Sequence, residues 1–185
     1  MRGDMEIKII SNKKQMEQEE GFIMQVVDVY KTKPQDISYL SYFLEHFFDT
    51  HKKNFIVIAK KDDKIISIAR FEYKYSIDNY DMKNKVLITG AQTLGTEQNQ
   101  GYATKIILTG IKKILKQDPE YNICLCVGKS NSAAIQVYKK LGFIIEEQEE
   151  NMDLPYFNKE HSFFMHYDKM LHNKTLHDKN ATSIL

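Results

Sequence analysis

The chain has 185 residues, a formal net charge of +1 at pH 7 and the apolar and charged fractions of an ordinary globular protein. A chain of this length can bury a sizeable core as one domain, and its near-neutral charge excludes an overall field that would recruit nucleic acid or an anionic membrane. We expect one domain over residues 1–171 and a polar, mobile tail over residues 172–185.

Apolar residues alternate with polar ones in the predicted strands and recur at helical spacing in the predicted helices. In the first half of the chain, the expected elements are a strand at 5–11, helices at 12–30 and 36–50, a hairpin of strands at 54–60 and 65–75 with its turn at 62–64, and a strand at 86–94. The aromatic residues of the second helix either form core or wall an acceptor site.

The second half continues the alternation of helices with strands. Its expected elements are a helix at 101–116, a buried strand at 122–127, a helix at 133–141, and strands at 143–147 and 162–167. Asn131 or Ser130 is a suitable N-cap for the second of these helices, and Gly142 is a suitable stop. The whole order predicts a mixed α/β (α+β) fold with about four helices against a mostly antiparallel sheet. The acidic run at 146–153 is expected to be a solvated loop.

Cysteine and histidine do not point to a metal or a disulfide framework. Cys124 and Cys126 are next-but-one neighbours on a predicted strand, and we expect both to be small buried hydrophobes. The histidines show no helical ligand pair and no cluster with cysteine, so we predict no metal. No apolar run approaches the length of a membrane span and no signal segment is visible, so we expect a cytoplasmic protein.

The segment TLGTEQNQGYAT, at residues 93–104, runs from a predicted strand through a polar turn into an amphipathic helix. The first turn of such a helix presents unpaired backbone N–H groups and the positive end of the dipole, which together suit a phosphate. Gly101 and Ala103 have minimal side chains, so a ligand can approach the backbone. Many strand–turn–helix units share these features, and alone they do not identify a ligand.

The segment KSNSAAIQVYKKLGF, at residues 129–143, reads as a capped helix with Tyr138 one turn before its end. By itself it predicts a partly buried aromatic residue. Together, the two segments resemble the motifs of the GNAT superfamily of acetyl-CoA-dependent acyltransferases. Residues 98–103, QNQGYA, match its pyrophosphate-binding pattern, Arg or Gln-x-x-Gly-x-Gly or Ala. Within the superfamily, the phrases Gln-x-Gln-Gly and Ser-Asn-x-Ala-Ala-Ile look most like the branch that acetylates ribosomal-protein N-termini.

The resemblance implies acetyl-CoA as the acyl donor and assigns residues to it. It implies backbone contacts to the acetyl and pantetheine groups from Ala91, Gln92 and Thr93. It implies a pyrophosphate site formed by Asn99, Gln100, Gly101, Tyr102, Ala103 and Thr104. It also implies that Asn131 meets the pantetheine arm and that Tyr138 is the general acid towards the departing thiolate. A phenol with a pKa near 10 is protonated at pH 7 and can take that role.

The residue at the expected position of the general base differs from that in the ribosomal-protein branch. Where that branch carries a Glu on the fifth strand, this sequence has Cys126, and an ordinary thiol does not replace a carboxylate as a base. We therefore consider Glu72 and Glu97, either of which can also be an ordinary surface charge. Alternatively, the amine arrives already deprotonated. With no histidine clearly placed to activate it, Cys126 is a poor candidate for a nucleophile.

The expected function is direct transfer of acetyl from acetyl-CoA to a primary amine on a protein N-terminus, a lysine or a small molecule. An acyl-CoA-binding sensor without turnover, on the same fold, is the competing reading, and transfer of a different acyl group is a third. The expected partner is the amine acceptor, with no nucleic acid and no membrane, and the chain is expected to be a monomer or a homodimer.

Overall fold

The structure, a computed structural model, describes residues 5–74, 84–146 and 160–170. The strands are β1 (Met5–Ile10), β2 (Phe55–Lys61), β3 (Lys64–Lys74), β4 (Lys85–Thr93), β5 (Asn122–Gly128), β6 (Phe143–Ile145) and β7 (Ser162–Tyr167). The helices are α1 (Lys13–Glu17), α2 (Phe22–Tyr30), α3 (Ile37–His46), α4 (Tyr102–Gln117) and α5 (Ser132–Lys140), with short 3-10 turns at Pro34–Asp36 and Gly95–Glu97.

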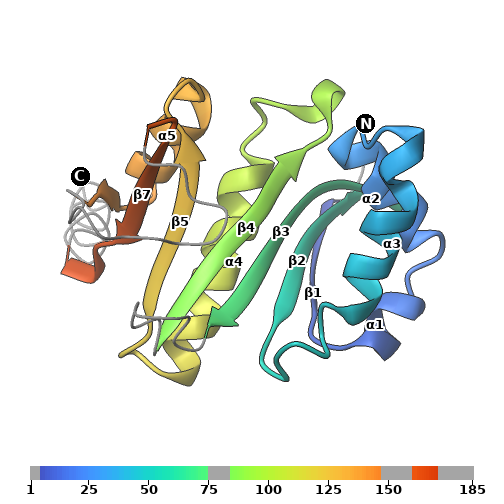
Figure 1. Cartoon of the computed structure of the whole chain (residues 1–185), viewed down its shortest axis with the longest axis horizontal. Helices are drawn as coiled ribbons and strands as arrows, with labels where there is room; N and C mark the ends of the chain where they lie inside the picture. The colour runs from blue at the N-terminus through green and yellow to red at the C-terminus, as the bar shows by residue number, and fades with distance from the viewer. Residues whose placement is uncertain (1–4, 75–83, 147–159, 171–185) are drawn as a thin grey trace, which may run out of the picture.

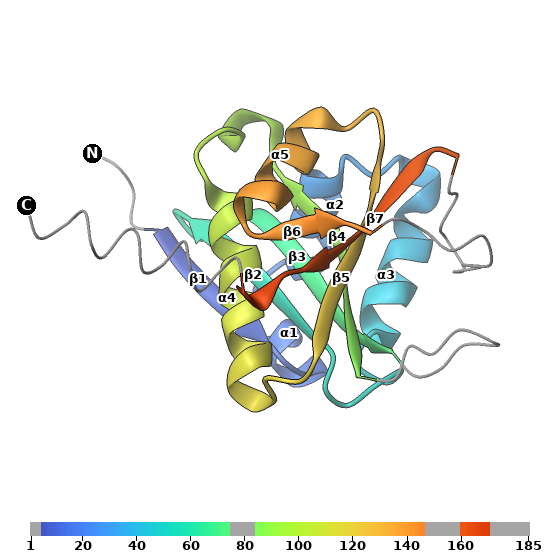
Figure 2. The same ribbon diagram turned by 90° about the vertical axis from the view of Figure 1, so that its left-hand side faces the viewer.

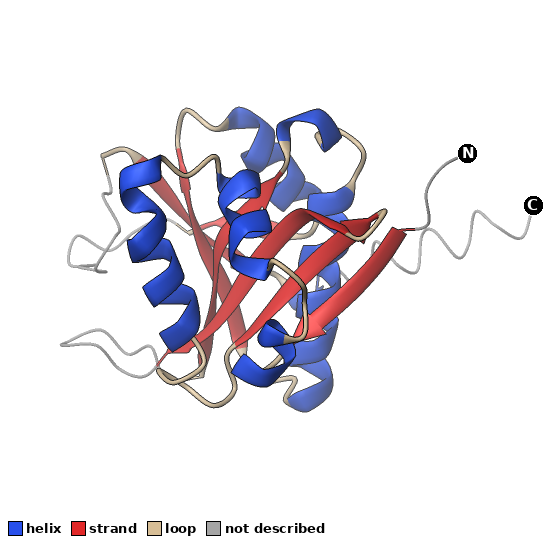
Figure 3. Cartoon of the chain, turned by 90° about the vertical axis from the view of Figure 1, so that its right-hand side faces the viewer, coloured by secondary structure: helices blue, strands red, loops and turns tan. Residues whose placement is uncertain are grey.

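The strands form a seven-stranded sheet in the order β1-β2-β3-β4-β5-β7-β6. Every neighbouring pair is antiparallel except β4 and β5, which are parallel. Helices cover both faces of the sheet (Figure 3), with α4 on one side and α3 on the other (Figure 2). The prediction of a mixed α/β fold with a mostly antiparallel sheet is confirmed. Among the described residues, no helix combines the length and hydropathy needed to cross a bilayer.

Two apolar cores lie on the two faces of the sheet, and the strand alternation explains both. In β2, Phe55 and Val57 belong to the core under α4 and α5, called here the α4/α5 core, whereas Ile56 and Ile58 belong to the core under α1, α2 and α3, called the α1–α3 core. All four side chains are fully buried. Burying each contributes about 1.5–3 kcal/mol, so β2 packs against helices on both faces of the sheet.

The helix predicted at 12–30 is instead two helices, α1 and α2, joined by a turn. Glu19 lies in this turn, and its carboxylate accepts hydrogen bonds from Lys8 at 2.9 Å and Lys60 at 2.7 Å. These contacts hold the turn against β1 and β2, which a continuous helix would not allow. The apolar spacing continues across the break, so periodicity alone did not reveal it.

The helix predicted at 36–50 ends earlier, at His46. The carbonyl oxygen of Phe47 accepts hydrogen bonds from Thr50 at 2.9 Å and from the Asn54 side chain at 3.0 Å. The Asn54 side chain also accepts a hydrogen bond from the backbone N–H of Tyr73. These side chains replace the helical partners of the last turn and tie the end of α3 to β2 and β3.

Candidate active site

The parallel strands β4 and β5 pair for only part of their length. Their ladder runs from Lys85 and Asn122 to Ile88 and Leu125, although β4 continues to Thr93 and β5 to Gly128. Beyond this point the two backbones separate, as Figure 1 shows, and the end of β5 pairs with β7 alone. The facing edges of β4 and β5 therefore carry backbone groups that neither strand satisfies for the other, and a ligand can hydrogen-bond there.

The start of α4 lies directly after β4 and its 3-10 turn. Gly101 is the N-cap, has φ of +79°, and no side chain caps the helix. A Cβ placed on Gly101 would meet no atom within 4 Å, so the space in front of the first turn is open. Uncapped N–H groups, the positive dipole end and open space together make this helix start a candidate anion site. Asn99 to Thr104, which the sequence assigns to the pyrophosphate, lie at this helix start, and their binding of pyrophosphate stays a prediction.

The start of α5 follows the end of β5 in the same way. Asn131 is the N-cap, and its side-chain oxygen accepts a hydrogen bond from the backbone N–H of Ala134 at 3.2 Å. Of the two caps considered from the sequence, Asn131 is the correct one.

Tyr138 lies near the end of α5 in the α4/α5 core, with its ring edge-on to Phe143 at a centroid distance of 5.9 Å. Leu125 and Val127 of β5 belong to the same core. Burial raises the pKa of Tyr138 above its ordinary value, so its hydroxyl is protonated at neutral pH. A protonated phenol can donate a proton to a departing thiolate, so the protonation state of Tyr138 is compatible with the role that the sequence predicts.

The opposite face of the sheet carries a hydrogen-bonded chain of polar side chains. Thr89 on β4 donates from its hydroxyl to the carboxylate of Glu72 on β3. The same hydroxyl accepts a hydrogen bond from Arg70 Nε at 3.3 Å. The Arg70 guanidinium lies 4.5 Å from the centre of the Phe43 ring on α3. Glu72 is thus held beside the point where β4 leaves β5.

Glu97 lies elsewhere, in the turn before α4, and is engaged in different contacts. Its two carboxylate oxygens lie 3.1 and 3.2 Å from Lys61 Nζ, and one also accepts a hydrogen bond from Gln100 at 3.0 Å. The hydrogen bond to Glu97 raises the pKa of Lys61. These contacts fix the turn that precedes the anion site, and the structure does not bring Glu97 into the chain that holds Glu72.

The two cysteines differ in burial, so the expectation that both are buried is wrong for Cys126. Cys124 is buried and its thiol lies 3.7 Å from the carbonyl oxygen of Val86 on β4. Cys126 is exposed because β4 has already separated from β5 at that level. Neighbouring protein atoms still displace much of the water around the sulfur. This desolvation raises the pKa of the Cys126 thiol to about 11, so the thiol is neutral at pH 7. A neutral thiol is neither a base nor a ready nucleophile.

Sequence reasoning missed a contact between Tyr30 and Gly90. The Tyr30 hydroxyl, at the end of α2, donates a hydrogen bond of 2.7 Å to the carbonyl oxygen of Gly90 on β4. The β3–β4 register shifts here between Ile68 and Arg70, which places one extra residue in β4 and makes a bulge. Gly90 has φ of +55°. A lone glycine inside a predicted strand is a known signal of a bulge and could have identified this position.

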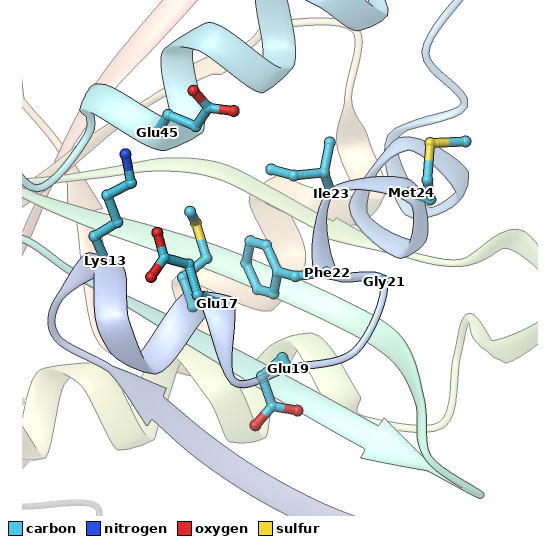
Figure 4. A pocket seen from close by; sticks show the side chains of 9 residues that line it. Lys13, Glu17, Glu19, Gly21, Phe22, Ile23, Met24 and Glu45 are labelled. Atoms are coloured by element: carbon cyan, nitrogen blue, oxygen red, sulfur yellow. The ribbon is translucent and has the colours of Figure 1, made fainter.

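A cavity of about 380 Å³ lies between α1, α2 and α3 (Figure 4). Its lining includes Lys13, Glu17 and Phe22 from the first two helices and Glu45 from α3. None of the residues that the sequence assigns to acetyl-CoA lines it. Among the described residues, no group of three or more His, Cys, Asp or Glu side chains is placed to hold a metal ion.

Comparison with known proteins agrees with this geometry. Residues 20–143 match the model of the acetyltransferase (GNAT) family. No curated protein matches the sequence. PaiA N-acetyltransferase from Thermoplasma acidophilum, solved in complex with coenzyme A, superposes with a TM-score of 0.60 at 16% identity, over 88% of this chain and 99% of that one.

Two further solved structures show the same fold. The ribosomal-protein-S18-alanine N-acetyltransferase from Escherichia coli has a TM-score of 0.59 at 14% identity, over 88% of this chain and 93% of that one. The yncA protein from Salmonella typhimurium, solved with its cofactor acetyl-CoA, has a TM-score of 0.57 at 15% identity, over 89% and 95%. With the family match over most of the chain, these findings show that the chain belongs to the acetyltransferase (GNAT) family and is an N-acetyltransferase that uses acetyl-CoA.

Proposed function

We propose that acetyl-CoA binds between β4 and β5 and that its acetyl group passes directly to a primary amine arriving from the α2 and α3 side. The observation that carries this proposal is the divergence of β4 from β5 next to the uncapped start of α4. The pyrophosphate meets the backbone N–H groups from Asn99 to Thr104, and the pantetheine arm lies along the β4 edge at Ala91, Gln92 and Thr93. Asn131 uses its side-chain oxygen to cap α5 and offers its amide nitrogen to the pantetheine arm.

In the proposed reaction, the amine nitrogen attacks the carbonyl carbon of the thioester and forms a C–N bond. The C–S bond then breaks, and the proton of the Tyr138 hydroxyl goes to the departing sulfur. Glu72 takes the proton that the amine must lose, either directly or through a water molecule. Both substrates are bound at once, so no acyl-enzyme intermediate is needed and Cys126 takes no covalent part.

We assign the role of general base to Glu72 rather than to Glu97. A base must have an oxygen directed at the incoming amine. Glu72 lies on the face of the sheet that carries α2 and α3, where its orientation is set by Thr89. Both oxygens of Glu97 are engaged with Lys61. The contacts therefore support a structural role for Glu97 in shaping the turn before the anion site.

The acceptor that we favour is the α-amine of a protein N-terminus. The sequence resembles the ribosomal-protein branch in its two cofactor motifs, and the Escherichia coli enzyme named for ribosomal protein S18 shares the fold. Lysine side chains and small amines are the other acceptors within the same chemistry.

A screen of acceptors tests this proposal. Release of the CoA thiol from acetyl-CoA is followed with peptides bearing a free N-terminus, polyamines, amino acids and aminoglycosides. We expect release above the acceptor-free rate with free-N-terminus peptides, and none with the same peptides blocked at the N-terminus. If polyamines or aminoglycosides are the only compounds that cause release of the CoA thiol, the acceptor is a small amine and not a protein N-terminus. Release with no amine would overturn the proposed reaction.

A further inference from the structure

We infer that Tyr30 is a positioning residue: its hydroxyl holds the β4 bulge so that the backbone N–H of Ala91 is aimed at the thioester carbonyl. This inference rests on the proposed binding of acetyl-CoA between β4 and β5. It adds a residue of α2, far from the two cofactor motifs, to the machinery that polarises the acetyl group.

The contact itself is well defined. Tyr30 and Gly90 are 60 residues apart in sequence, and the phenol oxygen lies 2.7 Å from the Gly90 carbonyl oxygen. Burial raises the pKa of Tyr30, and the Glu72 charge adds to this while Arg70 opposes it. The hydroxyl is therefore protonated at neutral pH and is a permanent donor to the carbonyl.

The hydrogen bond fixes the orientation of one peptide group. The C=O of Gly90 and the N–H of Ala91 belong to the same planar unit, and in a trans peptide they point in opposite directions. Because the carbonyl is drawn towards α2, the N–H points away from α2. The Ala91 side chain packs against the α4/α5 core, which places this residue on the side where the cofactor motifs lie.

The bulge interrupts the regular strand pairing at this peptide group. The β3–β4 register passes from Thr89 to Gln92, so neither Gly90 nor Ala91 has a Cα partner on β3. The β5 ladder has ended at Ile88. The Tyr30 hydroxyl thus bonds this peptide group at the point where both ladders are interrupted, and an N–H beside a thioester is the donor that a tetrahedral oxyanion needs.

The surroundings of Gly90 show that the arrangement is tightly built. A Cβ at this residue would lie 2.5 Å from the Tyr30 hydroxyl oxygen and 2.9 Å from Arg70 Nη2. Only a glycine allows both side chains to approach the bulge, and its φ of +55° is one that other residues rarely adopt. The closeness of Tyr30 and Arg70 therefore depends on the same residue that makes the bulge.

The test is the variant Tyr30→Phe, which removes the hydroxyl and keeps the ring. We expect kcat to fall roughly 10- to 100-fold, because a misdirected N–H loses part of the stabilisation that one oxyanion donor supplies. The dissociation constant of acetyl-CoA is expected to stay within about twofold, because the pyrophosphate site at α4 is unchanged.

A spectroscopic readout separates this role from a merely structural one. Infrared difference spectra of acetyl-CoA labelled with carbon-13 at the acetyl carbonyl report the polarisation of that bond in the binary complex, without any acceptor. We expect the band of the wild-type complex to lie below that of free acetyl-CoA, and the band of the Tyr30→Phe complex to return towards the free value.

Tyr121→Phe is the matched control, since Tyr121 also uses its hydroxyl in a hydrogen bond, from Lys53 at 3.1 Å, and lies beside the paired end of β5. We expect it to leave kcat and the infrared band unchanged. A Tyr30→Phe protein with the wild-type band and wild-type kcat would overturn the inference. So would a fall in kcat with the band unmoved, because Tyr30 would then be structural. Failure of wild-type protein to transfer acetyl to any amine would instead count against the proposed reaction, while the binary complex still tests Tyr30.

Discussion

Two carboxylates stand as candidates for the base, and their contacts separate them. Glu72 is linked through Thr89 to Arg70, and this chain of hydrogen bonds sets the direction of its side chain. Glu97 instead forms an ion pair with Lys61. This difference leads to a comparison of two conservative variants.

Glu72→Gln keeps the size and hydrogen-bonding capacity of the side chain but removes its basicity. We expect kcat/KM for the amine to fall most at low pH, where the neutral amine is scarce and a positioned base matters most. Glu97→Gln is expected to keep the wild-type pH profile and lose a little stability, because it breaks the ion pair with Lys61. The measurement is kcat/KM from pH 6 to pH 9 for both variants and the wild type.

Cys126→Ser serves as the control in this series. The neutral thiol of Cys126, with its pKa raised to about 11, has no role in the proposed reaction, so its replacement should be mild. A Glu72→Gln protein with an unchanged pH profile, together with a Cys126→Ser protein that has lost activity, would reverse the assignment.

Tyr138 is the proposed acid, and its burial keeps its hydroxyl protonated. Tyr138→Phe preserves the ring contact with Phe143 and deletes only the proton donor. We expect kcat to fall by roughly 10- to 1000-fold with little change in the dissociation constant of acetyl-CoA. Steady-state kinetics combined with a binding titration checks this. Wild-type turnover in the variant would reduce Tyr138 to a packing role.

At the scale of elements, the start of α4 is the feature on which binding depends. Gly101→Val places a β-branched side chain at a φ of +79° and into the open space before the helix. Saturating acetyl-CoA at one hundred times its dissociation constant stabilises a protein by about 2.7 kcal/mol, which raises the thermal midpoint by roughly 5–10 °C at this chain length.

We expect Gly101→Val to lose that rise. Differential scanning fluorimetry with and without acetyl-CoA measures it, and circular dichroism of the ligand-free variant confirms that the protein is folded. If acetyl-CoA raises the thermal midpoint of the folded variant as much as that of the wild type, pyrophosphate does not bind at the start of α4.

Local pattern predicted most of the elements because their signals are local. The strand at 162–167 was predicted with the bounds that the structure shows, and α4 differs from its prediction by one residue at each end. The break between α1 and α2 was missed because it depends on Glu19 reaching Lys8 and Lys60 on two strands. Long-range ion pairs of this kind leave no trace in apolar spacing.

The candidate site also combines features with local sequence signals and features that depend on long-range contacts. The starts of α4 and α5, at the N-caps Gly101 and Asn131, could be predicted because helix caps and turns depend on residues that are adjacent in the sequence. The Tyr30–Gly90 contact joins residues 60 positions apart, so no window of sequence contains it. The exposure of Cys126 likewise depends on where β4 and β5 separate. The predicted tail at 172–185 and most of the acidic run at 146–153 lie outside the described residues.

At the scale of the whole molecule, the central feature is a sheet that opens between its two parallel strands. The α4/α5 core lies on the side assigned to acetyl-CoA, and the α1–α3 core lies on the side assigned to the amine. Glu72 and Tyr138 belong to opposite faces of the sheet, so the proposed base and the proposed acid can act on the two sides of one thioester. This division predicts a ternary complex with direct transfer.

Transfer of a labelled acetyl group tests that account most directly. Wild-type protein is incubated with acetyl-CoA carrying carbon-13 in the acetyl group and with the acceptor found by the screen, and both protein and acceptor are measured by mass spectrometry. We predict one labelled acetyl group on the acceptor amine and none on the protein, whether or not the acceptor is present. A labelled acetyl group on the protein before the acceptor is added, passed on to the amine afterwards, would contradict direct transfer.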